Sequence, residues 1–160
     1  MTDLAPLQST LHYAFRDARL LELALTHRSL ARDSGDVSNQ RLEFLGDVVL
    51  GLAIADMLYA LFPTEDEGDL SKRLVGLVNG VQLAEIARVM ELGQYLFMSA
   101  GEAEQGGREN PSNLEDALEA LLGAIYRDGG YEAAREVVTR FWKPHAQASK
   151  APPKDAKTTL

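Results

Sequence analysis

The sequence lacks cysteine altogether, and three kinds of site are excluded with it. The chain can have no disulfide framework, no thiolate nucleophile and no cysteine-based zinc site, which agrees with a reducing compartment. Two further features are missing. The first residues, from Met1 to Pro6, contain no basic segment that leads into an apolar run, and the apolar stretch from Val48 to Ala55 stops at Asp56. We therefore expect no secretory signal, no membrane span and a cytoplasmic location.

Strand-like alternation of apolar and polar residues is also absent, and apolar residues recur at helical spacing instead. For example, Leu70, Leu74, Leu77, Val78 and Val81 fall at i, i+4, i+7, i+8 and i+11, which is typical of a helix that packs on a core. The 160 residues, 46% of them hydrophobic, leave room for one domain with a substantial core. The sequence therefore predicts an all-α domain.

The segment from Leu42 to Tyr59 is apolar around nearly its whole circumference, which predicts a central, buried helix. Two acids interrupt it. Glu43 and Asp47 are spaced i and i+4, so they share one face of the helix about one turn apart. Two carboxylates on one face of a buried apolar helix are unfavourable, so a partner or a function is expected for them.

The segment from about Leu114 to Tyr126 repeats this pattern, with Asp116 and Glu119 at i and i+3 on one face. An unpaired carboxylate in a low-dielectric interior costs several kcal/mol, so each acid must neutralise, meet a cation or bind a metal. The basic residues nearest in sequence, Arg41 and Arg127, are too few to pair with all four acids. The sequence therefore indicates either a metal site or acids paired in salt bridges, and the spacing alone is compatible with both.

The ligand chemistry narrows the choice of metal. Hard oxygen ligands without cysteine, and without histidine in either segment, favour Mg²⁺ or Mn²⁺ over zinc or a redox metal. Two such ions would serve in-line attack of water on a phosphodiester. A di-iron site would require Glu-x-x-His on its helices, and the histidine is lacking here. His27 continues an apolar helix stripe and is expected to be a core or hydrogen-bonding residue.

Five motifs occur in one order between about Leu11 and about Phe141. They are Leu25-Thr-His-Arg-Ser29, Arg41-Leu-Glu-Phe-Leu-Gly-Asp47, Asp66-Glu-Gly-Asp-Leu-Ser71, Gly106-Gly-Arg108 and Asp116-Ala-Leu-Glu-Ala-Leu-Leu-Gly-Ala-Ile-Tyr126. In this order they resemble the motifs of the ribonuclease III family, whose members are endonucleases of double-stranded RNA. Several ordered motifs make the resemblance far more specific than any one of them.

The resemblance implies that Glu43, Asp47, Asp116 and Glu119 are metal ligands, and that Asp47 and Glu119 are catalytic. It implies a homodimer that binds Mg²⁺, or Mn²⁺ in its place, and hydrolyses double-stranded RNA in the processing of rRNA and other RNA. The products would carry a 5′-phosphate, a 3′-hydroxyl and a short 3′ overhang. Phe44 matches an aromatic residue that enters a hydrophobic socket on the partner protomer, and its alternative interpretation is an ordinary core phenylalanine.

Positions near the predicted site also have other interpretations. Gln40 stands where many family members carry glutamate, so it keeps hydrogen-bonding capacity without the charge, and only an auxiliary role is expected for it. Glu67 matches a further acid near the site, but Thr64 to Glu67 is also a capping-box pattern that opens the next helix. The basic segment Ser71-Lys-Arg-Leu74 is shifted relative to the usual arginine spacing of the family.

Local signals predict where several elements begin and end. Ser112-Asn-Leu-Glu115 is a second capping-box pattern, which makes Glu115 a cap and not a ligand. Residues 99–110 are rich in glycine and glutamate and predict a loop. A last helix from Tyr131 to about Trp142 is expected to stop at Pro144. The predicted catalytic domain covers residues 1–145, and residues 146–160 have the composition of a linker that leads towards a missing double-stranded-RNA-binding domain.

The net charge of −8 is unfavourable for a protein that binds RNA through its phosphates. It argues against a free-standing tight binder but not against a nuclease, because site acids contribute to it and bound metal reverses it locally. Lys72, Arg73 and Arg108 are candidates for phosphate contacts, although exposed cations more often form a solvated face. The favoured interpretation is a double-strand-specific endoribonuclease. The alternative is a catalytically silent RNA-binding or dimerisation module of the same fold.

Overall fold

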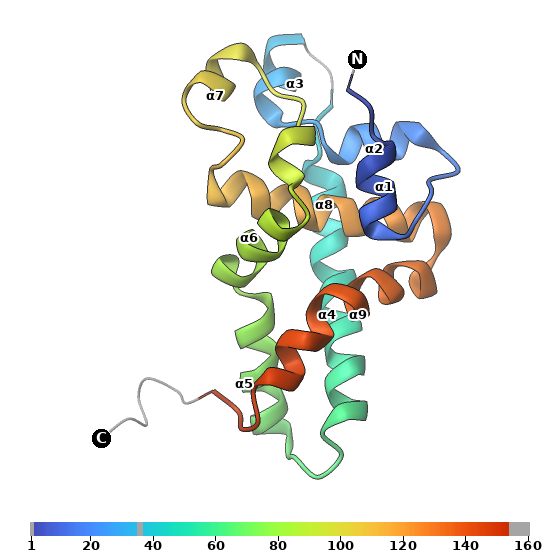
Figure 1. The fold of residues 1–160 in the computed structure, drawn as a ribbon, viewed down its shortest axis with the longest axis vertical. Coiled ribbons are helices and arrows are strands. Elements are labelled where there is room, and N and C mark those ends of the chain that lie inside the picture. The colour runs from blue at the N-terminus through green and yellow to red at the C-terminus, as the bar shows by residue number, and fades with distance from the viewer. Residues whose placement is uncertain (1, 35–36, 154–160) are drawn as a thin grey trace.

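The computed structural model describes residues 2–34 and 37–153, which form the predicted all-α domain (Figure 1). The elements in chain order are α1 (Ala5–Leu11), α2 (Ala18–Ala24), α3 (Arg28–Ser34), α4 (Gln40–Leu61), α5 (Glu67–Val78), α6 (Gly80–Val89), the 3-10 helix η1 (Leu92–Tyr95), α7 (Ala100–Glu104), α8 (Pro111–Gly129) and α9 (Tyr131–Ala148). Across the described residues, β-pairing is limited to one isolated parallel bridge between Thr26 and Phe97.

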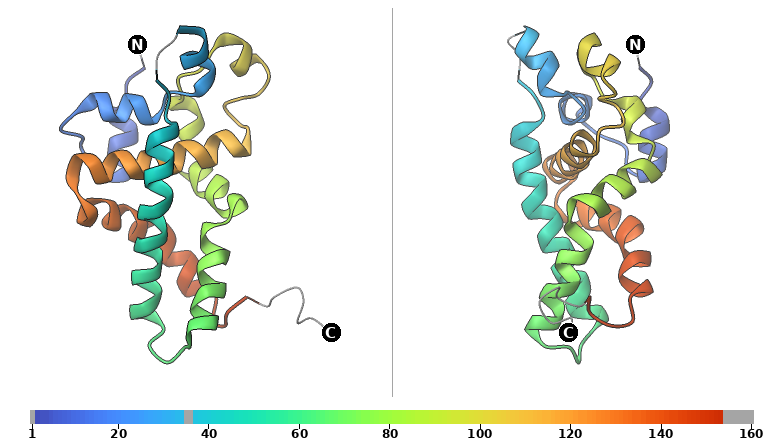
Figure 2. Two further views of the ribbon diagram at one scale, coloured as in Figure 1. Left: turned by 180° about the vertical axis from the view of Figure 1, so that it is seen from behind. Right: turned by 90° about the vertical axis from the view of Figure 1, so that its left-hand side faces the viewer.

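Helices α4 and α8 form the centre of the domain and cross steeply near the N-terminal third of α4 (Figure 2). Their backbones touch at the crossing because both helices carry glycine there. A β-carbon at Gly46 would overlap the carbonyl oxygen of Glu119, and a β-carbon at Gly123 would overlap the carbonyl oxygen of Leu42. These two glycines therefore set how closely the helices approach each other.

The other helices bury the remaining apolar faces of this pair. Helices α5 and α9 pack on α4, while α2, α6 and α9 pack on α8. Trp142 of α9 is fully buried, and its indole Nε1 donates a hydrogen bond to the carbonyl oxygen of Leu77 at 2.9 Å. Burial of such side chains is the main favourable term in folding, at about 25 cal/mol per Å² of apolar surface. The central core also includes Leu50, Ile54, Leu58, Leu83, Ile86, Leu118, Leu121, Leu122 and Ile125.

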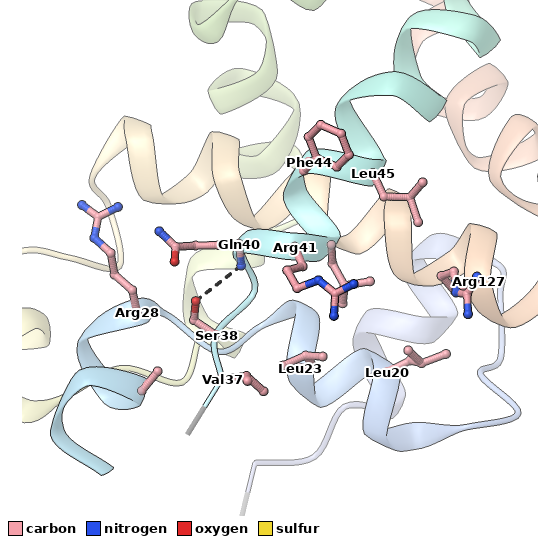
Figure 3. A pocket seen from close by; sticks show the side chains of 12 residues that line it. Leu20, Leu23, Arg28, Val37, Ser38, Gln40, Arg41, Phe44, Leu45 and Arg127 are labelled. Carbon is pink, nitrogen blue, oxygen red and sulfur yellow. Dashed lines mark hydrogen bonds between the residues drawn. The ribbon is translucent and has the colours of Figure 1, made fainter. Parts of the chain in front are cut away.

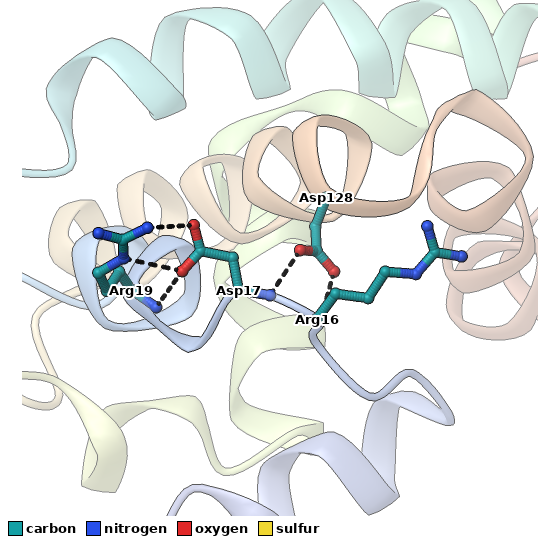
Figure 4. Close-up of polar contacts among 4 residues, drawn as sticks. All are labelled: Arg16, Asp17, Arg19 and Asp128. Carbon is teal, nitrogen blue, oxygen red and sulfur yellow. Dashed lines mark hydrogen bonds and ion pairs between the residues drawn. The ribbon is translucent and has the colours of Figure 1, made fainter.

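The C-terminal end of α8 is tied to the N-terminal part of the chain through Asp128 (Figure 4). Its carboxylate accepts hydrogen bonds from the Tyr13 hydroxyl at 2.6 Å and from the backbone N–H groups of Arg16 and Asp17 at 2.8 and 2.9 Å. Burial and this anionic neighbour raise the pKa of Tyr13 to about 12. Asp17 caps α2 by accepting from the Arg19 N–H.

Two predicted capping boxes are wrong. Asp66, and not Thr64, caps α5, and it accepts from the Asp69 N–H at 2.9 Å. Asn110 caps α8 one residue before Pro111, whose missing N–H needs no partner at the first helical position. The actual cap lies two residues before the expected pattern at α8 and inside the expected pattern at α5, so the pattern alone did not identify either cap.

The predicted loop at residues 99–110 is partly wrong, because it contains α7. Ser99 caps this short helix by accepting from the Glu102 N–H at 3.2 Å. Of the three glycines in this stretch, Gly101 lies inside the helix, whereas Gly106 and Gly107 follow it, and Gly106 has a positive φ of 83°. Ser and Glu three residues apart therefore outweighed the nearby glycines.

The prediction that Pro144 stops the last helix is also wrong, since α9 continues to Ala148 with Pro144 inside it. Proline removes one hydrogen bond to the carbonyl four residues earlier. Trp142 and Ala146 lie on one face and are both buried, so the continued apolar contact holds the helix together across the proline. The last helix thus extends beyond residue 145.

Helix α4 is the one helix of the described segments whose length and apolar composition would suffice for a membrane span. This differs from the expectation drawn from Val48 to Ala55, because the whole helix of 22 residues is counted and isolated acids are tolerated. Central helices of soluble proteins have the same character. Leu50, Ile54 and Leu58 place α4 in the protein core.

Candidate active site

The crossing of α4 and α8 brings the predicted acids together. Carboxylate oxygens of Glu43, Asp116 and Glu119 all lie within 4.8 Å of one another, and Asp47 is close enough to Glu119 to raise its pKa. The glycine contact explains this proximity, because Gly46 separates Glu43 from Asp47 along α4 and rests against the backbone of Glu119. The four acids predicted from two distant segments therefore form one cluster.

Glu115 joins these four acids, which the sequence did not predict. The cap at Asn110 leaves its side chain free, and its carboxylate lies close to the start of α6, where a β-carbon at Gly80 would be 2.8 Å from Oε2. The i, i+4 spacing of Glu115 and Glu119 indicates that they share a face of α8, but the capping-box interpretation assigned Glu115 another role. We refer to Glu43, Asp47, Glu115, Asp116 and Glu119 as the acidic cluster.

The acidic cluster disfavours its own ionisation. Burial raises the pKa of Glu119 to about 9, and the hydrogen bond and negative charge of Asp47 add to this rise. Burial is also the first cause that raises the pKa of Glu43, Glu115 and Asp116. Carboxylates that repel one another in a partly buried site are an arrangement that a divalent cation would stabilise.

Cations of the protein do not neutralise the acidic cluster. In residues 2–34 and 37–153, none of its carboxylates has a Lys, Arg or His nitrogen within 4.0 Å as an ion-pair partner. Arg28 lies within electrostatic reach and lowers the pKa of Glu43 and Asp116, but less than burial raises each. The salt-bridge alternative is therefore not supported for these acids. Their oxygen ligands fit a hard divalent ion such as Mg²⁺ or Mn²⁺.

The two auxiliary residues lie in different places. Gln40 is the exposed first residue of α4, one turn before Glu43. Glu67 is the exposed first residue of α5, past the opposite end of α4 (Figure 1). Fourteen residues of helix separate Asp47 from the end of α4 at Leu61, which is about 21 Å. Within one chain, therefore, Glu67 does not reach the acidic cluster.

The basic candidates for phosphate contacts are mostly engaged elsewhere. Arg73 is buried and pairs with Glu65, so it is neither a solvated cation nor a phosphate ligand. The Arg108 guanidinium donates to the carbonyl oxygens of Leu96 at 2.6 Å and Gly93 at 3.2 Å. Lys72 is exposed.

A hollow of about 1160 Å³ lies beside the N-terminal part of α4 (Figure 3). Its wall is mostly apolar, and its ends carry Arg28 with Gln40 on one side and Arg127 on the other. Phe44 lies at its rim with 75% of its surface exposed, so it is not a core phenylalanine. Val48 and Leu52 continue an exposed apolar stripe along α4. We call this surface the Phe44 face. The residues lining the hollow are Leu20, Leu23, Arg28, Ala31, Val37, Ser38, Gln40, Arg41, Leu42, Phe44, Leu45 and Arg127.

Known proteins share both the sequence and the fold. The chain is 50% identical over 149 residues to ribonuclease 3 of Ehrlichia ruminantium (strain Welgevonden), and this match covers 92% of the chain and 66% of the relative. It is 47% identical over 160 residues to ribonuclease 3 of Azorhizobium caulinodans, covering 99% and 68%. The chain thus spans about two thirds of the length of these curated relatives.

A crystal structure of the nuclease domain of ribonuclease III from Campylobacter jejuni superposes with a TM-score of 0.84 at 42% identity. The match covers 91% of this chain and 97% of that one. A second structure of the same nuclease domain, described for flexibility in a region involved in dimer formation, gives the same TM-score. The Ribonuclease-III-like family model matches residues 17–145. The chain therefore belongs to the Ribonuclease-III-like family.

Proposed function

We propose that this chain is the nuclease domain of a ribonuclease III and that it hydrolyses double-stranded RNA with Mg²⁺, for which Mn²⁺ can substitute. The observation that carries the proposal is the acidic cluster at the α4–α8 crossing, whose carboxylates have no ion-pair partner in the part of the chain that the structure describes. The expected products have a 5′-phosphate, a 3′-hydroxyl and a short 3′ overhang. Processing of rRNA and other RNA in the cytoplasm is the corresponding role.

In this proposal Glu43, Asp47, Asp116 and Glu119 hold the metal, and Asp47 and Glu119 act closest to the reacting phosphate. A bound divalent ion would supply charge stabilisation and an activated water for phosphodiester hydrolysis. The protein's own contribution is position. The fixed glycine contact holds the two acid pairs at one place, so little reorganisation is needed when the ion and substrate arrive. Gln40, one turn before Glu43, is assigned an auxiliary hydrogen-bonding role.

The Phe44 face supports a homodimer. An exposed aromatic ring beside a large apolar hollow is unfavourable in water and is typical of an interface anchor. A two-fold axis brings the same surface of both protomers together, so the Phe44 of each can enter the hollow of the other. An auxiliary role of Glu67 at the acidic cluster would then have to be exerted across the dimer, because α4 separates the two in one chain.

The decisive experiment incubates the protein with long duplex RNA in Mg²⁺, in Mn²⁺ and with EDTA, and analyses the product ends. We expect cleavage with either ion, none with EDTA, and 5′-phosphate ends. Single-stranded RNA of the same sequence is the control for strand specificity. Binding or dimerisation without any metal-dependent cleavage would instead identify the silent module of the same fold.

The assembly is tested by light scattering over a dilution series. Phe44→Ala should weaken association by about 2 kcal/mol or more, so the variant should dissociate at higher concentration than the wild type. Val89→Ala is the matched control, because Val89 is 66% exposed but lies on α6, away from the hollow. A wild type that is monomeric at micromolar concentration would contradict the dimer.

The role of residues 146–160 as a linker stays a prediction. Residues 146–160 are proposed to lead towards a double-stranded-RNA-binding domain, although helix α9 occupies the first three of them. An acidic nuclease domain alone should bind duplex RNA weakly, with affinity that falls steeply as salt rises. Fusion of such a basic domain after residue 160 should restore cleavage near physiological salt by raising the effective concentration.

A further inference from the structure

The motif His27-Arg28-Ser29 has no role in the function described so far, yet its histidine is 9% exposed and fully hydrogen-bonded. The Ser29 backbone N–H donates to His27 Nδ1 at 3.0 Å, and His27 Nε2 lies 3.0 Å from Asn113 Oδ1. A backbone N–H can only donate, so Nδ1 is the acceptor and Nε2 of the neutral ring carries the hydrogen given to Asn113. The amide group of Asn113 donates in turn to the Glu102 carboxylate and the Gly107 carbonyl, each at 3.0 Å.

This buried network fixes the backbone of Arg28 relative to α8. Asn113 stands three residues before Asp116, one helical turn away on the same face. The Ser99 N–H donates to Ser29 Oγ at 3.0 Å, and the His27 N–H donates to the Phe97 carbonyl at 2.8 Å. The segment from Phe97 to Ser99 therefore also fixes the backbone on both sides of Arg28. The position of Arg28 is thus determined by its buried neighbours.

The Arg28 side chain itself is exposed and is not paired with the acidic cluster. None of the ion pairs found in residues 2–34 and 37–153 includes it. It nevertheless lies near the acidic cluster, because its neighbour His27 bonds to Asn113, one turn before Asp116 on α8. Arg28 also lines the same hollow as Gln40, which is one turn before Glu43 on α4. In Figure 3 it stands at the Gln40 end of the hollow, while Arg127 stands at the opposite end. Arg28 is therefore a cation close to the acidic cluster whose donors remain available.

We propose that Arg28 is a substrate-positioning residue that binds a phosphate of the RNA strand lying over the acidic cluster. This inference rests on the proposed function and identifies how an acidic protein attracts its anionic substrate. The planar guanidinium can bind two phosphate oxygens at once, which a lysine ammonium does not do in the same geometry. With a net charge of −8 and several carboxylates at the site, a cation beside the acids offsets part of the repulsion that a phosphate meets there.

The test compares Arg28→Gln, Arg28→Lys and Arg140→Gln, where Arg140 is an exposed α9 residue whose loss changes the net charge equally. With one duplex RNA in Mg²⁺, Arg28→Gln should raise KM about tenfold or more, as expected for a lost charged hydrogen bond. The slope of log(kcat/KM) against log[salt] should become less steep by about one. Arg28→Lys should recover part of the binding, and Arg140→Gln should behave like the wild type.

Two readouts separate this role from a structural one. Mn²⁺ binding to the RNA-free protein, followed by electron paramagnetic resonance, should be unchanged or tighter in Arg28→Gln, because a competing positive charge is gone. The melting temperature should be unchanged. Weaker Mn²⁺ binding together with a lower melting temperature would overturn the proposal in favour of a structural role. Equal KM and salt slope in Arg28→Gln and Arg140→Gln would overturn it as well.

Failure of the proposed function is distinguishable from failure of this inference. If the wild type does not cleave, duplex binding is measured by fluorescence anisotropy with labelled RNA in Mg²⁺. Weaker binding of Arg28→Gln than of Arg140→Gln would still support the phosphate contact, although the nuclease assignment would have failed. Equal binding of the two variants would overturn the phosphate contact.

Discussion

The Arg73 site and the acidic cluster both hold charged groups away from bulk water, but only the Arg73 site satisfies them. The Arg73 guanidinium donates to both oxygens of Glu65 at 2.6 and 2.7 Å and to the Ser149 carbonyl at 2.7 Å, and it stacks on the Phe62 ring at 3.7 Å. The pKa of Glu65 is lowered by the hydrogen bond from Arg73. In the acidic cluster, by contrast, like charges face one another.

The difference indicates what each site does. A fully satisfied ion pair links α5 to the chain that follows α9 and serves the fold. Unsatisfied carboxylates oppose folding and persist only where the surrounding packing holds them, as at functional sites. In the acidic cluster that packing is the glycine contact between α4 and α8. The following changes test this contrast, beginning with the largest expected effect.

Gly46→Ala should have the largest effect, because the added β-carbon would overlap the Glu119 carbonyl oxygen and force α4 and α8 apart. We expect a loss of several kcal/mol of stability, or failure to fold, by analogy with overpacked cores. Gly51→Ala is the matched control on the same helix, since nothing lies within 4 Å of its added carbon. The control should be neutral or stabilising by up to about 1 kcal/mol. Thermal denaturation of both variants is the measurement, and equal melting temperatures would contradict the role of the contact.

Glu119→Gln should abolish metal-dependent cleavage, with a loss on the order of a thousandfold, while the fold remains intact. The amide keeps the shape and removes the charge, so the repulsion from Asp47 is relieved and stability should be retained or rise. Asp47→Asn should behave in the same way. The measurements are cleavage of duplex RNA and thermal denaturation of the metal-free protein. Wild-type rates in either variant would refute the assignment of these acids.

Arg73→Met should have the opposite profile, with a melting temperature lower by several degrees and a nearly unchanged rate per folded molecule. Removing the Arg73 guanidinium leaves the Glu65 carboxylate without the hydrogen bonds that satisfied it. The double variant Arg73→Met/Glu65→Gln should recover part of the loss, which measures the coupling between the two. If Arg73→Met keeps its stability but loses affinity for duplex RNA, Arg73 contacts an RNA phosphate and its structural role is refuted.

Sequence reasoning reached the acidic cluster but not the Arg73 site, for a physical reason. The acids are revealed because carboxylates contrast with apolar helices at fixed local spacing, and the family resemblance unites the two helices. Arg73 depends on Glu65 and on the carbonyl of Ser149, 76 residues away, which no local pattern discloses. The same limit applies to Arg28, whose place is set by contacts between His27 and Asn113 across 86 residues.

Helix periods were predicted well because each apolar stripe is a local feature, whereas helix ends were predicted poorly. Asn110 and Asp66 cap α8 and α5, although Ser112 and Thr64 nearby have side chains that can also cap a helix. The continuation of α9 through Pro144 depends on the tertiary burial of Ala146. The incorrect cap at α8 affected the predicted site, because it assigned Glu115 a capping role and so left Glu115 out of the predicted acidic cluster.

The two sites should also show a pH dependence of opposite sign. The pKa of Glu119 rises from 4.5 in a free side chain to about 9 in the fold, so the folded state binds more protons between these values. Stability of the metal-free protein should therefore fall as pH rises from about 5 to about 9. The lowered pKa of Glu65 acts in reverse, because its contribution is present above the ordinary glutamate pKa and is lost as pH falls below it. Melting temperatures from pH 5 to pH 9 should decline in the wild type and less steeply in Glu119→Gln, while Arg73→Met should keep the wild-type slope over this range. Equal slopes in the wild type and Glu119→Gln would show that Glu119 is not the group whose ionisation the fold resists.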